Sequence, residues 1–420
     1  MSDGARDLLV RGIAAAKAGE DKEARHYLEW ALRQEPSADE QIEAWLWLSE
    51  VAREKEEARR WVEEVLASEP HNPRALRRLA LLDGRLQASD LADPDHLPVA
   101  GSTHEPVEVE RFACPSCGGQ MAYAPDGDGL QCDHCGHRTG VRSGAAAPEL
   151  GTDDFVLALA TARGHHSPQV SPTFACTACG ARFLLAPATL SLTCPYCDAT
   201  YAVEVSDARL LIAPQAIVPL MVTLDEAKHS LVAWSRKNAG DETFNLDRLT
   251  AMYLPFWLFE MGGVIEWSAA VGAGSRWPRE EDPLSGTEPP ASPMAVLACS
   301  NPRPGAAAAV ESTDLALLVA FDPAYLAALP TETYTLSMAN AALRARQRAL
   351  HMTGEKLTFE SGGVRLSLRS ARMVVTSYRL ALAPVWLGDV RSGETRRLLI
   401  VSGVTARVHA EKPLPGRIID

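Results

Sequence analysis

Apolar residues recur with a helical period through residues 1–88, and polar residues fill the positions between them. Two stretches of this region, GEDKEARHYLEWALRQEP and REKEEARRWVEEVLASEP, align at a shift of 34 residues, which carries Leu28 onto Val62. The segment Asn72–Pro73 combines a good helix cap with a proline in the first turn, so it predicts the start of a third, truncated helix. The pattern predicts an array of helical pairs.

The 34-residue period resembles the tetratricopeptide repeat family. The first repeat has small residues at Gly12 and Ala24, which let two helices approach closely, and Leu28 fills the core between them. The second repeat is looser, because Leu46 stands where the family's pattern has glycine. The resemblance implies a concave surface that binds a peptide or a protein, and the residues leave a packing or dimerisation platform open as the alternative.

Helical and strand periods alternate through residues 205–420, which predicts a mixed α+β domain. We expect helices over about 224–237 and 338–351. We expect a strand, a turn and a second strand within 252–272, and a hairpin near the end of the chain, where YRLALAPVWLGDV is followed by RRLLIVSGVTARV.

Three weaker patterns also lie in this domain. The stretch KLTFESGGVRLSLRS at 356–370 predicts a hairpin, and the Gly-, Pro- and Ala-rich residues 272–310, which include Cys299, predict a long loop. The segments PFWL at Pro255 and PVWL at Pro384 look alike, and each is expected to begin a strand pair after a helix. We therefore expect that the domain consists of two related halves.

The linker segments between these regions are polar, contain Pro and Gly, and show no helical period. A short capped helix is expected from Asp154 onward, within the second linker. The expected fold class is multidomain α+β, with these parts: tetratricopeptide-like helical repeats at 1–88, a linker at 89–110, a first zinc ribbon at 111–142, a linker with the short helix at 143–172, a second zinc ribbon at 173–204, and the α+β domain at 205–420.

Eight of the nine cysteines form four Cys-x2-Cys pairs, and both neighbouring sets of pairs enclose 14 residues. Two residues between thiols let a tight turn point both sulfur atoms at one ion, and two such turns complete a tetrahedral site that suits Zn²⁺. Units of about 30 residues bury too little apolar surface to fold without such help. The predicted ligands of two structural zinc ions are Cys114, Cys117, Cys132 and Cys135 in the first site, and Cys176, Cys179, Cys194 and Cys197 in the second.

Four thiolates fill the coordination shell of zinc and leave no open position for catalysis. His134 and His137 stand beside ligands, and we expect both to be surface residues. The His165–His166 pair lacks a partner of suitable spacing, so we expect a surface or packing role for it. Disulfide bonds are the alternative use of the eight thiols, and they fit a chain expected in the cytoplasm poorly.

The chain has a formal net charge of −13 and a sequence pI near 5.4, which gives no overall attraction to phosphate backbones. The first ribbon offers two basic residues, Arg111 and Arg138, and the second offers Arg182. Nucleic acid is therefore not the expected partner. The chain opens without a secretory signal, and the uncharged stretch 210–224 contains two prolines, so no membrane span is expected and we predict a cytoplasmic protein.

Several segments together resemble a family of uncharacterised bacterial zinc-ribbon proteins that are often labelled after the primosomal replication helicase. These segments are VPLMVTLDEAKHSLVAW, MYLPFWLFE, FDPAYLAALPTETYTLSMANAALRAR and LAPVWLGDVRSGETRRLLIVSGVTARVHAEKP, and the resemblance covers about 150–420. It implies the fold and the zinc but no established activity. In such relatives the last hairpin reads Asn-Gly-x-Thr-Gly, where this chain has Ser402, Gly403, Val404, Thr405 and Ala406.

The sequence lacks the Gly-x4-Gly-Lys-[Ser/Thr] loop that a helicase motor needs, and it contains no other catalytic motif that we recognise. We therefore expect a non-enzymatic zinc-binding adaptor or scaffold. Its protein partner is unknown and would bind through the helical repeats or the α+β domain. The alternative is a nucleic-acid-associated accessory factor that uses its ribbons, and an enzyme with a site assembled in the α+β domain is the least favoured possibility.

Overall fold

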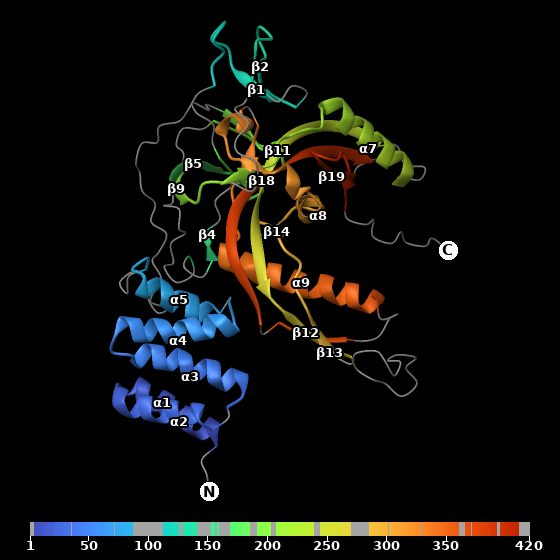
Figure 1. Cartoon of the computed structure of the whole chain (residues 1–420). Helices are drawn as coiled ribbons and strands as arrows, with labels where there is room; N and C mark the ends of the chain where they lie inside the picture. The colour runs from blue at the N-terminus through green and yellow to red at the C-terminus, as the bar shows by residue number, and fades with distance from the viewer. Residues whose placement is uncertain are drawn as a thin grey trace, which may run out of the picture.

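The computed structural model has helices in the N-terminal part of the chain, short hairpins that carry the cysteine pairs in the middle, and a sheet-rich C-terminal part (Figure 1). The overall class is therefore mixed α+β. The residues that the structure describes are 4–34, 36–70, 72–86, 112–125, 129–140, 153–155, 158, 169–184, 191–202, 207–238, 244–269, 285–300, 302–327, 329–360, 366–370, 372–392 and 395–410. The linker expected at 89–110 and the pair at 165–166 lie outside them.

Five helices stack side by side at the N-terminal end (Figure 1). Close packing explains the small residues, since a Cβ on Gly12 would lie 2.7 Å from Cγ of Leu28. The side chain of Asn72 caps the last helix by accepting the N–H groups of residues 74 and 75, as expected for a third, truncated unit. The helices are α1 (Ala5–Lys17), α2 (Asp21–Leu32), α3 (Ala38–Val51), α4 (Lys55–Ser68) and α5 (Pro73–Leu82).

Two small hairpin units follow the helical array. In the first, β1 (Met121–Ala124) pairs with β2 (Gly129–Cys132), which pairs with β3 (Arg138–Gly140). The second unit contains β5 (Gln169–Ala175), β6 (Arg182–Leu184), β7 (Ser191–Thr193) and β8 (Thr200–Ala202), and β5 also pairs with β9 (Asp207–Leu211). We call residues 112–140 ribbon 1 and residues 173–202 ribbon 2. The helix expected from Asp154 falls mostly outside the described residues, although the described Phe155 and Ala158 are helical. Asp153–Asp154 form β4, which pairs with β18 (Met373–Ser392).

The C-terminal part is organised around two antiparallel strands of 20 residues each, β11 (Phe244–Gly263) and β18 (Met373–Ser392). The two strands lie side by side (Figure 1). Leu254 faces Ala383 near the middle of the pair. Shorter strands extend the sheet on both sides: β10 (Ala216–Ile217), β14 (Met294–Leu297), β15 (Val319–Ala320), β16 (Thr331–Glu332), β19 (Thr395–Ser402) and β20 (Val408–His409). A separate small sheet contains β12 (Ile265–Ala269), β13 (Ser285–Glu288) and β17 (Leu366–Arg369).

Two long helices, α7 (Leu224–Asn238) and α9 (Met338–Glu360), pack on this sheet, and each precedes one of the long strands. Their ends are tied to the sheet in the same way. The indole N–H of Trp257 donates to the carbonyl of Leu336 at 2.9 Å, just before α9. The indole N–H of Trp386 donates to the carbonyl of Val222 at 2.9 Å, just before α7. The contact of β11 with the segment before α9 therefore matches the contact of β18 with the segment before α7.

The two prolines within the long strands make matching backbone hydrogen bonds. The carbonyl of Pro255 accepts the N–H of Ala298 at 2.9 Å, and the carbonyl of Pro384 accepts the N–H of Gly403 at 3.0 Å. Our expectation that each proline begins a strand pair is wrong, because both lie well inside β11 and β18. The strands continue through them because the carbonyl of each proline still bonds to a neighbouring segment. The backbone contacts of the two prolines therefore match.

The long loop expected over 272–310 is also wrong for most of its described part, which contains β13, β14 and the short helix α8 (Ala306–Glu311). Its apolar run Met294–Leu297 is buried and pairs with β11, so burial overrides the loop-like composition. The first arm of the hairpin expected at 356–370 is helical instead. Leu357 continues the buried stripe of α9 at a spacing of four residues from Thr353, which extends the helix to Glu360.

Candidate metal centres

Ribbon 1 brings its four predicted ligands together in two turns. The N–H of Gly118 donates to the carbonyl of Cys114 at 2.8 Å, and the N–H of Gly136 donates to the carbonyl of Cys132 at 3.0 Å. Both glycines have positive φ, 72° and 71°, which closes each turn around its cysteine pair. The Sγ atoms of Cys114 and Cys135 lie 3.5 Å apart, and those of Cys117 and Cys132 lie 3.6 Å apart.

Ribbon 2 repeats this geometry. The N–H of Gly180 donates to the carbonyl of Cys176 at 2.8 Å, and the N–H of Asp198 donates to the carbonyl of Cys194 at 3.0 Å. The nearest sulfur pairs are again 3.5 and 3.6 Å apart. Asp198 has a positive φ of 63° where the other turns have glycine. Its side chain forms an ion pair with Arg248, which ties this turn to β11.

Each cluster has the size of a tetrahedral metal site, since all four sulfur atoms lie within 4.8 Å of one another. A disulfide bond would hold two sulfur atoms at about 2.05 Å, much closer than the distances found here. Zinc–sulfur bonds of about 2.3 Å place tetrahedral neighbours somewhat under 4 Å apart. All nine cysteines are free thiols. Each cluster can therefore hold one metal ion, and its donor set is the one that zinc prefers.

The acid–base properties of the thiols also favour a bound cation. The N–H of Gly119 lowers the pKa of Cys117, but the neighbouring thiols of Cys135 and Cys132 outweigh it and raise that pKa to about 12. Burial opposes ionisation of Cys176, yet the Tyr201 hydroxyl and further hydrogen bonds bring its pKa down to about 6. The contrast also holds within ribbon 1, where burial opposes ionisation of Cys114 but hydrogen bonds bring its pKa down to about 7, while the pKa of Cys117 is raised. Within such a cluster one thiolate forms readily and makes the next one costly. A divalent ion removes that cost by compensating the accumulated negative charge.

The environment of ribbon 2 holds its second turn inside the protein. Pro195 and Tyr196 are buried, and the Tyr196 hydroxyl donates to a carboxylate oxygen of Glu332 at 2.5 Å. The guanidinium of Arg303 lies 4.8 Å from the centroid of the Tyr196 ring and donates to the carbonyl of Cys179 at 3.3 Å. The strand β6 of ribbon 2 pairs with β16, which carries Glu332, so the ribbon joins the main sheet.

Ribbon 1 contacts the rest of the protein through its β1–β2 hairpin, at the end opposite to its two cysteine turns. The side chains of Met121, Tyr123 and Leu130 in its hairpin are buried, and the Tyr123 ring lies 5.2 Å from the ring of Tyr325. The N–H of Tyr123 donates to the carbonyl of Ala327 at 3.2 Å. Its two metal-binding turns therefore lie away from this contact. In Figure 1 the hairpin β1–β2 projects at the end of the molecule remote from the helical array.

A buried polar group beside ribbon 2 was not anticipated from the sequence. Cys299, expected in a loop, is 3% exposed in the core, next to Glu332. Burial and the carboxylate of Glu332 raise the pKa of Cys299, which keeps its thiol protonated and poorly nucleophilic. Burial also raises the pKa of Glu332, whereas Tyr196, Cys299 and Arg303 act in the opposite direction. No sequence pattern links these residues, since Tyr196 and Glu332 are 136 positions apart.

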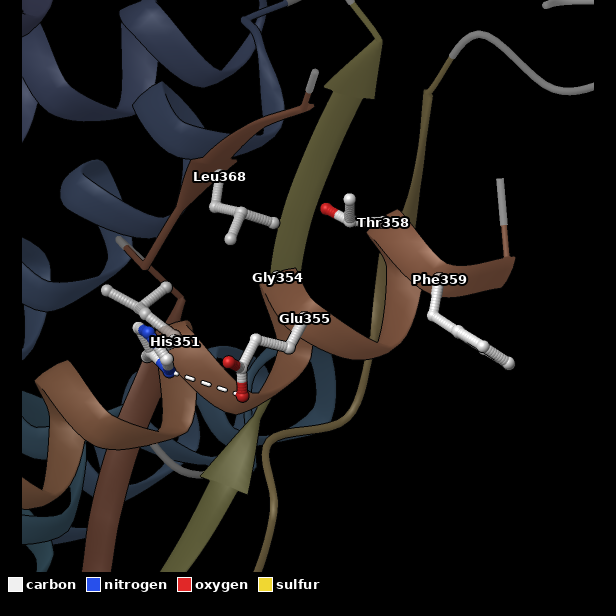
Figure 2. A pocket seen from close by; sticks show the side chains of 7 residues that line it. His351, Gly354, Glu355, Thr358, Phe359 and Leu368 are labelled. Atoms are coloured by element: carbon white, nitrogen blue, oxygen red, sulfur yellow. Dashed lines mark ion pairs between the residues drawn. The ribbon is translucent and has the colours of Figure 1, made fainter. Parts of the chain in front are cut away.

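The remaining candidates lie outside the two clusters. His134 is exposed and His137 is half-buried, and neither belongs to a cluster of possible metal ligands among the described residues. An open groove of about 810 Å³ runs along the C-terminal half of α9 beside β17 (Figure 2). Its titratable side chains are His351 and Glu355, whose Nδ1 and carboxylate oxygen lie 3.4 Å apart and are largely exposed. This pair has the properties of a solvated surface contact.

Comparisons with known proteins found no match to a family model, to a curated protein or to a solved structure. The resemblance to bacterial zinc-ribbon proteins therefore stays an expectation drawn from the sequence. Within the part of the chain that the structure describes, none of the helices combines the length and the apolar character needed to cross a bilayer.

Proposed function

We propose that the protein is a zinc-bound, non-enzymatic adaptor that binds a partner protein through its helical array. The observation that carries this proposal is a surface on which three helices contribute side chains around one aromatic ring. The amine of Lys17 from α1 and the guanidinium of Arg74 from α5 each lie 5.8 Å from the ring centroid of Trp47 in α3. Tryptophan and arginine are the residues that most often dominate protein–protein binding energy.

The composition of this surface indicates its partner's chemistry. Glu43 pairs with Arg74 at 2.6 Å, so one acidic group is already accommodated beside the ring. A partner segment that carries a carboxylate next to an apolar or aromatic side chain would match both the cations and the ring. The array has hydrophobic clusters of its own, so it can present this surface without help from the sheet.

In this proposal the two zinc ions have a structural role. Four thiolates saturate zinc and leave it without a site for water or substrate. The protonated Cys299 is a poor nucleophile, and the exposed pair His351–Glu355 resembles a surface contact more than an acid–base site. These features support a non-enzymatic role. The ribbons would complete and brace the sheet, while the helical array makes the external contact.

The test compares the purified full-length protein with Trp47→Ala and with a matched control, Trp30→Ala, which removes a 38% exposed tryptophan from α2. Proteins captured by the wild type and by Trp30→Ala should be lost with Trp47→Ala. Lys17→Glu, a surface change, should weaken the same capture without altering the thermal transition. Identical capture by all variants would contradict an adaptor surface at Trp47, and a metal content near zero would contradict the zinc assignment.

The nucleic-acid alternative makes a separate prediction, namely salt-dependent binding that is lost when a ribbon ligand is replaced, for example in Cys176→Ser. The basic residue of the described part of ribbon 1, Arg138, already donates a hydrogen bond to Gln131 at 2.8 Å. Binding of fluorescent single-stranded and duplex DNA and RNA at low salt would measure this directly. Tight binding that weakens steeply with salt would favour the alternative over the adaptor.

A further inference from the structure

The two ribbons have the same ligand spacing but expose different parts to solvent. A shift of 62 residues superimposes their ligands, carrying Cys135 onto Cys197. At the second turn, ribbon 1 exposes Cys135 and His134. The matching residues of ribbon 2 are less accessible, since Cys197 is half-buried and Tyr196 is 4% exposed. The sequence predicts two equivalent sites, and the structure makes them inequivalent.

At the first turn, too, the cysteines of ribbon 1 are more accessible to solvent than those of ribbon 2. Cys117 of ribbon 1 is exposed, and Gly118 and Gly119 beside it carry no side chain that could shield it. Cys179 of ribbon 2 is half-buried. The Tyr201 hydroxyl also lies 3.5 Å from Sγ of Cys176, so it covers a further part of that site.

Opening the second site requires disruption of the α+β domain. The second turn of ribbon 2 can move only if the Tyr196–Glu332 hydrogen bond breaks and Arg248 releases the carbonyl of Pro195, which it holds at 2.6 Å. Breaking one buried hydrogen bond to a charged group lowers the population of the open state by a factor of roughly ten or more. The turns of ribbon 1 lie away from its attachment at the hairpin end, so their opening leaves that attachment intact.

From this difference we infer that ribbon 1 is a peroxide-sensitive zinc site and that ribbon 2 is a protected one. An exposed thiolate of ribbon 1 attacks hydrogen peroxide, forms a sulfenic acid and releases hydroxide. A neighbouring thiolate then attacks the sulfenic sulfur, forms a disulfide and releases a second hydroxide. In sum, two thiolates, one peroxide and two protons give one disulfide and two waters, so sulfur loses two electrons and peroxide gains them.

The sulfur positions indicate which bonds form. The nearest pairs join one exposed with one buried cysteine, Cys135 with Cys114 and Cys117 with Cys132. The exposed member meets the oxidant, and the buried member lies about 3.5 Å away to resolve the sulfenic acid. A zinc ion that has lost two of its four thiolate donors is weakly held and is released. This inference rests on the zinc occupancy proposed above.

The experiment uses the full-length, zinc-loaded protein and measures zinc release with a coloured chelator during exposure to hydrogen peroxide. Metal analysis before exposure should give about two zinc ions per chain, and a value near zero refutes the proposed zinc binding itself. With both ions present, one equivalent should leave at least about tenfold faster than the other, as expected from one buried charged hydrogen bond. Release of both at one rate, or no release, overturns the inference alone.

Mass spectrometry after alkylation identifies the site that reacts. Disulfides should appear first between residues 114 and 135 and between 117 and 132, and reductant with added zinc should restore the starting state. Tyr196→Phe should accelerate release from ribbon 2 without changing the rate at ribbon 1. Tyr334→Phe, which removes the hydroxyl that accepts the N–H of Ile212, is the matched control and should change neither rate. Faster oxidation of ribbon 2 in the wild type would contradict the inference.

Discussion

Replacing Tyr196 by phenylalanine removes one oxygen atom from the contact between ribbon 2 and the sheet. The Tyr196 hydroxyl donates to a carboxylate oxygen of Glu332 at 2.5 Å, and Tyr196 is 4% exposed. A hydrogen bond to a charged group is worth about 1.5–3 kcal/mol, and a buried carboxylate that loses its donor adds a desolvation cost. We therefore expect Tyr196→Phe to lower the free energy of unfolding of the zinc-loaded protein by about 2–4 kcal/mol.

The matched control is Tyr334→Phe. The Tyr334 hydroxyl accepts the N–H of Ile212 at 3.1 Å, a neutral contact in a half-buried position. Its loss should cost about 1 kcal/mol. Both variants keep an aromatic ring, so the difference between them isolates the charged hydrogen bond from packing. Urea unfolding followed by tryptophan fluorescence measures both costs under one set of conditions.

A double-mutant cycle with Glu332→Gln completes the test. The amide of glutamine can still accept from Tyr196 but carries no charge, so the loss caused by Tyr196→Phe should shrink by about 1 kcal/mol or more in that background. A cost for Tyr196→Phe no larger than that for Tyr334→Phe, or equal costs in both backgrounds, would refute the reasoning. Ribbon 2 would then be held mainly by strand pairing and apolar contact.

Three further outcomes follow from the described contacts. Gly263→Ala should destabilise the protein by at least about 2 kcal/mol, because φ is +78° and the new Cβ would lie 1.9 Å from the carbonyl oxygen of Arg372. Gly84→Ala, also at positive φ but in open space, should cost about 1 kcal/mol, and thermal melts of the two variants measure the difference. Ala406→Gly should raise the free energy of unfolding by about 1 kcal/mol in urea titrations, since Ala406 has φ 57°. Burial, with a smaller effect of Arg407, lowers the pKa of His409 below 6.5. The contribution of His409 to stability is therefore full above pH 6.5 and is lost as the pH falls through the folded pKa. The stability advantage of the wild type over His409→Gln should shrink from about pH 7.5 to about 5.5 in thermal melts, and a constant difference would contradict this.

The two cysteine clusters could be predicted from the sequence because each one depends on local spacing. Each Cys-x2-Cys turn closes through hydrogen bonds between neighbours, such as that from Gly118 to Cys114, so spacing alone specifies the geometry. Helices with strong caps were similarly accessible, and the cap at Asn72 is the example.

Other features depend on partners that are distant in the sequence. The segment 294–297 becomes β14 because β11 buries it, and nothing within its Gly- and Pro-rich surroundings signals that partner. Helix α9 continues to Glu360 because Leu357 finds apolar contact in the tertiary structure. The contact between Tyr196 and Glu332 spans 136 positions and depends on a charge that local propensity would not place in a core. At β14 and at the end of α9, local composition predicts the wrong element because burial against distant residues determines the structure.

Two matching backbone positions beside β11 and β18 carry different side chains, and only one of the two side chains binds a ribbon residue through its carboxylate. Ile217 pairs with β18 as Thr331 pairs with β11, so the following residues, Val218 and Glu332, occupy matching positions. Val218 is completely buried in apolar surroundings, whereas Glu332 accepts the Tyr196 hydroxyl. A carboxylate at the position of Val218 would be costly to bury among these apolar side chains. The two positions therefore differ in chemistry: Glu332 holds the second turn of ribbon 2 against the domain core, while ribbon 1 leaves Cys117 and Cys135 exposed to reagents in solution.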